Sequence, residues 1–380
     1  MADMLPFIDL KAQQARIRDD VDARLAKVLD HGAYIMGPEV KELEETLGAW
    51  AQTKHVISCS SGTDALILAL LGLGLRPGQG VICPSFTFAA TAEAMAVLGA
   101  SAIFADVDPH SFNLDPRNLS SALQAGIDAG LEVVGIMPVG LFGMPADIFA
   151  IRDFAKKHGL WMIDDAAQSF GATLNDIPVG KLADATCTSF FPAKPLGCYG
   201  DGGALFTDSD EIAEIAVSCR VHGMGKTKYH NERIGMTARL DTMQAAILLS
   251  KLTIFKEELI ARQNVADSYN ALLGDSVITP RLSQGATSAW AQYTVKLPTG
   301  LDRGAVQEHL AAKGVPTMIY YPIPMHKQAP YQRYPVANGE LAITDKLCDI
   351  VLALPMHPYM EEAQIVKVAD ALKEAVNQAD

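Results

Sequence analysis

Between His55 and Thr207, short runs rich in β-branched and aromatic residues alternate with longer stretches of helical periodicity. Most helical stretches carry a glycine near their C-terminal end, a common way for a helix to stop. This alternation is typical of βαβ units, which build a mostly parallel sheet covered by helices on both faces. The last two strands are joined too closely for a crossover helix, so we expect them to pair antiparallel. The expected strands are HVISC, GVICP, SAIFADV, EVVGIMPV, LWMID, ATCTSFF and GALFT.

The chain of 380 residues is longer than one hydrophobic core usually supports, so we expect two domains. A helical N-terminal arm precedes the alternating region, and a long helical segment follows it. A strand at AQYTVKL, a proline-rich loop at YYPIPMHKQAPY and a helical tail complete the sequence. We predict a large α/β domain of residues 1–250 and a smaller α+β domain of residues 251–380.

The composition excludes several classes of function. The formal net charge of −13 argues against a nucleic-acid partner, which requires a basic surface. The six cysteines are scattered without a C-x-x-C pair, so we expect neither a metal site nor disulfides, and a reducing compartment. The N-terminus lacks the pattern of a signal peptide, and the most apolar segment, ALILALLGLGL, is too short to span a bilayer. We therefore expect a cytoplasmic protein without a membrane partner.

One lysine stands in an unusual setting. In SFFPAKPLGCYGDGGALF, Lys194 lies among aromatic, proline and glycine residues, with no acid within six positions. Lysine is rarely buried unless it is paired or used. The segment fits a strand that delivers a reactive amine to a cleft. From this stretch alone, an exposed lysine in a surface loop is an equally good interpretation.

The segments that follow the other strands bear on this choice, because ligands of open α/β sheets bind at the carboxyl ends of the strands. After HVISC, the segment SSGTDAL places Gly62 at a helix start, which suits either a phosphate or a plain N-cap. After GVICP, Phe86 and Phe88 fit either ring stacking or core packing. After LWMID, Asp165 precedes Gln168 by three residues; a carboxylate there needs a cation or a strong donor, unless it is an N-cap.

Together these elements match one cofactor. A phosphate cradle, an aromatic platform, a carboxylate for a pyridine nitrogen and a lysine for an aldehyde are what pyridoxal 5'-phosphate requires. SSGTDAL, PSFTFAATAEA, IDDAAQSFGA, SFFPAKPLGCYGDGGA and RIGMTARLDTMQAAIL closely resemble the DegT/StrS-type nucleotide-sugar aminotransferases. The resemblance runs from FIDLKAQQ to LALPMHPYM and implies a type I (aspartate aminotransferase-like) fold with about seven strands in its main sheet.

The resemblance implies a role for each matching position. Lys194 would bond the cofactor aldehyde, and Asp165 would keep the pyridine nitrogen protonated. An amine in that role must lose its charge, and a desolvated site lowers the pKa of a lysine, which explains the lack of acids around Lys194. Further residues would hold the cofactor: Gln168 at the ring hydroxyl, Phe88 on the ring, and Gly62, Thr63 and Ser189 at the phosphate.

The resemblance also implies a homodimer with shared active sites. Relatives complete the phosphate site with an asparagine of the partner subunit. Thr237 stands at that position, so either a hydroxyl makes the contact or the contact is lost. Arg239 would reach across the dimer interface. The neighbouring Lys226, Lys228 and Arg233 fit either a solvated loop or a basic face for a diphosphate or carboxylate.

The resemblance is strongest to members that aminate UDP-linked N-acetylated sugar acids for surface polysaccharides such as lipopolysaccharide. We therefore expect a pyridoxal-phosphate-dependent aminotransferase that moves an amino group from glutamate to a UDP-linked 3-keto sugar acid. Those members carry a histidine where this chain has Tyr320, while Tyr321 is retained. Because tyrosine is neutral near pH 7, a neutral keto-sugar stays an alternative substrate. Arg239, as an anchor for a carboxylate, favours the acid.

Two other functions are compatible with this fold. Some relatives are dehydratases with a histidine in place of the lysine, and Lys194 argues against that reaction. A sensor that binds a nucleotide sugar without turnover is not excluded by fold alone. Such a protein has no evident need for the lysine and acid together, so the enzyme is the favoured hypothesis.

Overall fold

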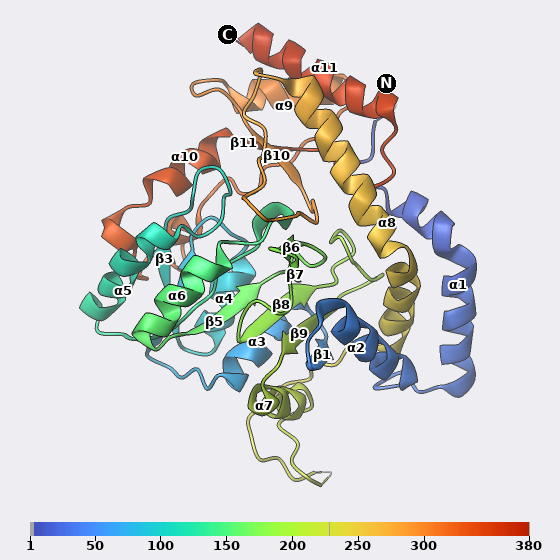
Figure 1. Cartoon of the computed structure of the whole chain (residues 1–380), viewed down its shortest axis with the longest axis vertical. Coiled ribbons are helices and arrows are strands. Elements are labelled where there is room, and N and C mark those ends of the chain that lie inside the picture. Colours follow the sequence, from blue (N-terminus) through green and yellow to red (C-terminus); the bar gives the residue numbers. More distant parts are fainter. Residues whose placement is uncertain (1–3, 228, 380) are drawn as a thin grey trace.

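The computed structural model describes residues 4–227 and 229–379. A seven-stranded sheet forms its centre, in the order β1-β9-β8-β5-β4-β2-β3 (Figure 1). β9 runs antiparallel to both of its neighbours, and the other four strand pairs are parallel. The predictions of a mostly parallel sheet and of antiparallel pairing between its last two strands, β8 and β9, are thus confirmed. The strands are β1 (His55–Cys59), β2 (Gln79–Pro84), β3 (Ser101–Ala105), β4 (Glu132–Ile136), β5 (Trp161–Asp165), β8 (Ala185–Ser189) and β9 (Gly203–Thr207).

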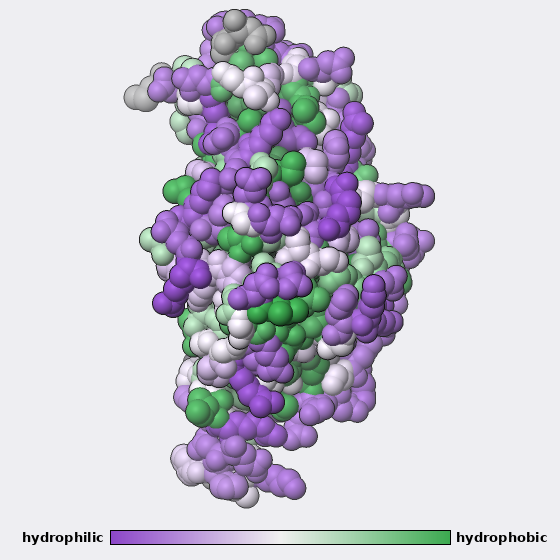
Figure 2. Space-filling view, turned by 90° about the vertical axis from the view of Figure 1, so that its left-hand side faces the viewer, coloured by the Kyte–Doolittle hydropathy of each residue, from purple (hydrophilic) through white to green (hydrophobic). Residues whose placement is uncertain are grey.

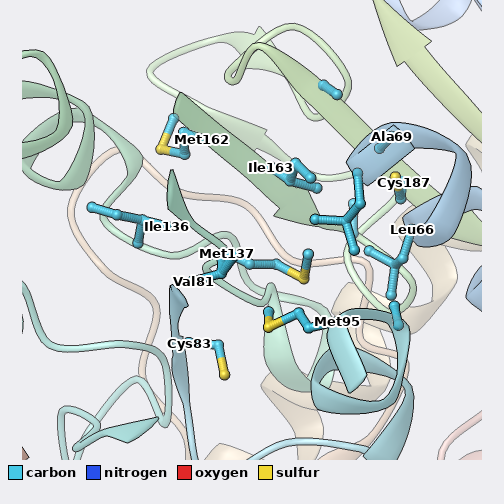
Figure 3. Close-up of a cluster of buried hydrophobic side chains, with 14 of the residues drawn as sticks. Leu66, Ala69, Val81, Cys83, Met95, Ile136, Met137, Met162, Ile163 and Cys187 are labelled. Carbon is cyan, nitrogen blue, oxygen red and sulfur yellow. The ribbon is translucent and has the colours of Figure 1, made fainter. Parts of the chain in front are cut away.

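Helices cover both faces of this sheet (Figure 1). α3 is apolar on all sides, as expected of a helix buried in a large core. Leu66 and Ala69 of α3 pack with Ile163 and Cys187 of the strands, and Met95 of α4 lies close by (Figure 3). The helices of the large unit are α2 (Pro38–Ala51), α3 (Gly62–Gly72), α4 (Ala89–Val97), α5 (Leu119–Asp128), α6 (Ile148–His158) and α7 (Asp210–Arg220).

A long helix, α8 (Thr242–Leu273), joins the large sheet to a smaller unit. The first half of α8 packs with Phe206 in a cluster on the large sheet, while its last residues pack with Tyr293 and Leu352 of the smaller unit. The helix runs unbroken across residues 250 and 251, so the division at that point stays a prediction. α1 (Leu10–His31) packs on α8. The remaining elements are β6 (Thr173–Leu174), β7 (Ile177–Pro178), β10 (Tyr293–Lys296), α9 (Arg303–Ala312), α10 (Ala342–Ile350), β11 (Val351–Leu354) and α11 (Glu362–Ala379).

Short 3-10 helices among the described residues lie at Pro116–Asn118, Leu141–Gly143, Met325–Lys327 and Ala337–Gly339. β10 and β11 form an antiparallel pair in the smaller unit. Of the helices in the described ranges, none combines the length and the apolar character needed to cross a membrane.

The end of β5 carries two adjacent acids with different surroundings. Asp164 is fully buried opposite Thr186 of β8, and its carboxylate has no hydrogen-bond partner among the described residues. Burial, reinforced by the neighbouring Asp165, raises the pKa of Asp164 to about 7. Asp164 therefore holds a proton in the folded protein at pH values where the unfolded chain has released it.

We expect this proton to make stability depend on pH. Because the folded pKa of Asp164 is the higher one, its contribution is lost as pH rises from about 4 to about 7, by about 1.4 kcal/mol per pH unit at most. Asp164→Asn carries no such proton, so its free energy of unfolding relative to wild type should rise with pH and level off above about 7. Urea unfolding of both proteins from pH 5 to pH 8 measures this difference. A difference that stays constant with pH would contradict the expectation.

Candidate active site

A cavity of about 460 Å³ lies at the carboxyl ends of β1, β2, β5 and β8. Its volume is within the usual range for a cofactor or ligand site. Nine of the residues singled out in the sequence line it, although they are spread over the chain. They are Gly62, Thr63, Phe88, Asp165, Gln168, Ser189, Lys194, Tyr320 and Tyr321.

Lys194 reaches the cavity from the turn that follows β8. Its backbone N–H donates to the carbonyl of Phe191 at 2.8 Å. The turn doubles back so tightly that a Cβ at Gly197 would lie 2.5 Å from the Phe191 oxygen, which explains the glycine. Burial lowers the pKa of Lys194 to about 8, although Asp165 acts in the opposite direction. The amine can therefore be neutral close to physiological pH.

Asp165 faces Lys194 from the end of β5 and is only 5% exposed. Thr91 of α4 donates its hydroxyl to Oδ2 at 2.9 Å, and the N–H of Ala167 donates to Oδ1 at 3.2 Å. Burial raises the pKa of Asp165, while these two donors and Lys194 oppose the rise. A carboxylate held in this way is fixed in place and retains one side for a positively charged partner.

The N-terminus of α3 forms one end of the cavity. Ser61 caps the helix by accepting the N–H of Asp64 at 3.0 Å. A Cβ at Gly62 would lie 2.7 Å from Cβ of Ser189, so the helix start and the end of β8 meet closely at this glycine. A helix N-terminus that lines a cavity beside small residues is suited to an anion.

Aromatic residues form the opposite wall. Phe86 is fully buried, so it belongs to the core, whereas Phe88 is 57% exposed and lines the cavity. The ring centroids of Phe88 and Tyr321 are 6.2 Å apart. The Gln168 side chain accepts the N–H of Phe142 at 2.8 Å and donates to the Tyr321 hydroxyl at 3.2 Å. Of the two predicted aromatic residues, only Phe88 is free to stack on a ligand.

These groups fit pyridoxal phosphate. The cavity brings together a lysine with a lowered pKa, a fixed carboxylate, an anion-binding helix end and an exposed aromatic ring. Lys194 would hold the aldehyde, Asp165 the pyridine nitrogen, and Gly62 with Ser189 the phosphate. Glycine at position 62 is the strictest of these requirements, because any side chain there would collide with Ser189.

Two predicted residues lie elsewhere. Thr237 and Arg239 do not line this cavity. The Thr237 hydroxyl is paired with Nε2 of His222 at 2.8 Å, and Nε of Arg239 is enclosed without a partner among the described residues. Arg233 pairs with Glu214 at 3.2 Å, so it belongs in part to a local ion pair. Lys228, the fourth basic residue of this segment, lies outside the described residues.

Several residues at the site had no signal in the sequence. Thr91 does not line the cavity but holds Asp165 from a helix that otherwise reads as plain packing. Gln292 lines the cavity and precedes a strand of the smaller unit. The contribution of both depends on contacts between distant parts of the chain. Thr87, Phe191 and Asp201 are among the other lining residues. In the described ranges, no group of three or more His, Cys, Asp and Glu side chains is placed to hold a metal ion.

Known proteins are similar to this chain in sequence and in fold. The model of the DegT/DnrJ/EryC1/StrS aminotransferase family matches residues 15–373. The chain is 47% identical over 370 residues to the UDP-2-acetamido-2-deoxy-3-oxo-D-glucuronate aminotransferase of Pseudomonas aeruginosa, across 97% of this chain and 99% of that protein. A crystal structure of a DegT DnrJ EryC1 StrS aminotransferase from Brucella abortus is similar, with a TM-score of 0.95 and 46% identity over 97% of this chain and 99% of the other.

A more distant structure is similar over the whole chain. NtdA from Bacillus subtilis, with bound cofactor PMP, matches with a TM-score of 0.88 and 31% identity, over 100% of this chain and 86% of the other. The family model and these relatives agree with the cavity described above, in which a lysine, an acid and a helix N-terminus meet. The chain therefore belongs to the DegT/DnrJ/EryC1/StrS aminotransferase family.

Proposed function

We propose that this protein transfers an amino group from glutamate to the C3 keto carbon of a UDP-linked N-acetylated sugar acid, with pyridoxal phosphate as its cofactor. The observation that carries the proposal is one cavity holding Lys194, Asp165 and the N-terminus of α3, in a chain 47% identical to an aminotransferase named for such a substrate. The product would serve the assembly of a surface polysaccharide.

The side chains divide the work of the reaction. Bound pyridoxal phosphate supplies an electron-withdrawing ring that stabilises negative charge on the carbon that loses its proton. Lys194, with a pKa of about 8, takes up that proton as a general base and returns it as a general acid. Asp165 would hold the ring nitrogen in its positive form. Phe88, which lines the cavity, would cover the ring face and exclude water from it.

A neutral keto-sugar is the second candidate, because Tyr320 lines the cavity and provides no positive charge. A panel of UDP-linked keto-sugars distinguishes the two. Enzyme first converted with glutamate should regain its original visible absorption fastest with the 3-keto sugar acid. If the absorption recovers only with neutral sugars, a neutral keto-sugar is the substrate. If glutamate removes the absorption once but no sugar is then aminated, the sensor is favoured.

We also propose a homodimer with shared active sites. Among the described residues that line the cavity, Lys194 is the only basic one, yet a diphosphate and carboxylates require several cations. Residues 221–227 and 229–238 project from the molecule beyond α7 (Figure 1), and this end of the molecule is mainly hydrophilic (Figure 2). Ile234 in this loop is 91% exposed, an arrangement that suits burial against a partner. Arg239, at its base, would then serve the partner's cavity.

Mixing two inactive variants tests this sharing. Lys194→Ala and Arg239→Ala chains, mixed and allowed to exchange, should regain about a quarter of wild-type activity, because half of the dimers are hybrids with one intact site. The separate variants, treated in the same way, are the controls. Activity that stays at the mean of the two separate variants would show that each site is built from one chain.

A further inference from the structure

The side chain of Gln292 lines the active-site cavity from the smaller unit, immediately before β10. Its backbone N–H donates to the carbonyl of Phe142 at 3.3 Å. The N–H of the same Phe142 donates to the side chain of Gln168 at 2.8 Å. Gln292 is therefore tied to the loop that orients Gln168 and, through it, Tyr321. This places Gln292 next to the part of the cavity wall that Gln168 and Tyr321 form.

The amide of Gln292 is not satisfied by the protein. Oε1 is buried and has no hydrogen-bond partner in the described part of the chain. The side chain also borders a small pocket of about 20 Å³, shared with Phe142 and Trp290. A leucine of similar size would suit such neighbours better, because an unpaired buried amide oxygen costs free energy. A ligand that donates a hydrogen bond to Oε1 accounts for the glutamine.

The chemistry of the oxygen limits which group that ligand can present. Oε1 accepts hydrogen bonds only, so neither a keto oxygen nor a carboxylate can be its partner. The amino group of glutamate must react near Lys194 and is not available to stay on Gln292. The sugar acid of the proposed function carries two donors on its ring, the hydroxyl at C4 and the N–H of the acetamide at C2, and only the hydroxyl has an acceptor on each side. The keto oxygen at C3 and the carboxylate at C5 lie beside it and can accept from Nε2.

We propose that Gln292 binds the C4 hydroxyl of the keto-sugar and so selects for sugars that retain it. The inference rests on the proposed function, because the C4 hydroxyl is singled out by that substrate. A site built to hydrogen-bond a substrate hydroxyl rejects an analogue that lacks it, since the polar group of the protein is then left unpaired. Gln292 thus contributes to substrate selection from a unit that does not carry Lys194 or Asp165.

The test compares two ligands on the intact holoenzyme by calorimetry: the UDP-linked 3-amino sugar acid and its 4-deoxy analogue. Wild type should bind the hydroxyl form about tenfold more tightly, the value of one to two neutral hydrogen bonds. Gln292→Leu should lose this preference. Gln292→Glu keeps an acceptor and should retain it. Thr294→Val, which removes another buried hydroxyl two residues further along that does not line this cavity, is the matched control and should behave as wild type.

The possible failures are separable. If Gln292→Leu weakens both ligands equally, or if removing the C2 acetamide rather than the C4 hydroxyl abolishes the effect of the substitution, the assignment of Gln292 to the C4 hydroxyl is wrong. The assignment is also wrong if wild type binds both ligands equally well. If wild type binds neither ligand and aminates neither keto-sugar, the proposed substrate itself fails.

Discussion

Replacing Lys194 with alanine is expected to slow amino transfer by about 10²–10⁴-fold, the range that one positioned acid–base group contributes. The variant lacks the amine that would move the proton in the proposed reaction, and no other basic side chain lines the cavity within the described residues. Stopped-flow absorption during glutamate addition measures the rate. Borohydride treatment followed by peptide mass spectrometry should find the cofactor attached to wild type at Lys194 and unattached to the variant. This result would also separate the aminotransferase from the untethered dehydratases.

Lys251 offers a matched control. It is fully buried on α8, 4.5 Å from the ring centroid of Tyr199, and burial lowers its pKa to about 8, as for Lys194. It does not line the cavity. Lys251→Met should therefore transfer amino groups at the wild-type rate once it is folded. Equal losses for the two variants would mean that burial of a lysine, and not its place in the cavity, is what matters.

Asp165→Asn is expected to lower the rate by about 10²–10³-fold, as removal of one preorganised electrostatic group does in other enzymes. Asparagine preserves the size of the side chain, and its oxygen can still accept from Thr91, but the negative charge is lost. The cofactor nitrogen would then no longer be held positive, so the ring withdraws electrons less strongly. Single-turnover rates with glutamate and with a keto-sugar measure the effect on each half-reaction.

The adjacent Asp164 is the control for this substitution. Successive residues of a strand point to opposite faces of the sheet, so Asp164 faces away from the cavity that Asp165 lines. Asp164→Asn should change stability with pH, as described above, and leave the single-turnover rates within about twofold of wild type. A loss of rate in Asp164→Asn as large as in Asp165→Asn would show that the field of both acids, and not contact with the ring, sets the rate.

Much of this architecture follows from the sequence alone. Strand and helix periodicities are local, and each of the seven expected strands is found in the sheet. Gly62 and Asp165 are candidates from the sequence because each stands at or just after the end of a strand, and the carboxyl ends of parallel strands meet at one edge of a sheet. Ser189 is a candidate only through the family resemblance. Lys194 was recognised because a lysine among apolar residues and glycines is unusual. Pattern and chain order made these positions candidates, and the resemblance of the combined set to one family decided between the open interpretations.

Other features depended on packing between distant segments. Phe86 and Phe88 stand two residues apart after the same strand, and only contacts of Phe86 with Phe112 and Phe142 decide that Phe86 is core while Phe88 is exposed. Thr91 reaches Asp165 across 74 positions of the chain. Gln292 enters the cavity only because α8 carries the smaller unit back over the sheet (Figure 1). A local pattern encodes periodicity and capping, but the partner of a side chain is chosen by whichever distant surface packs against it.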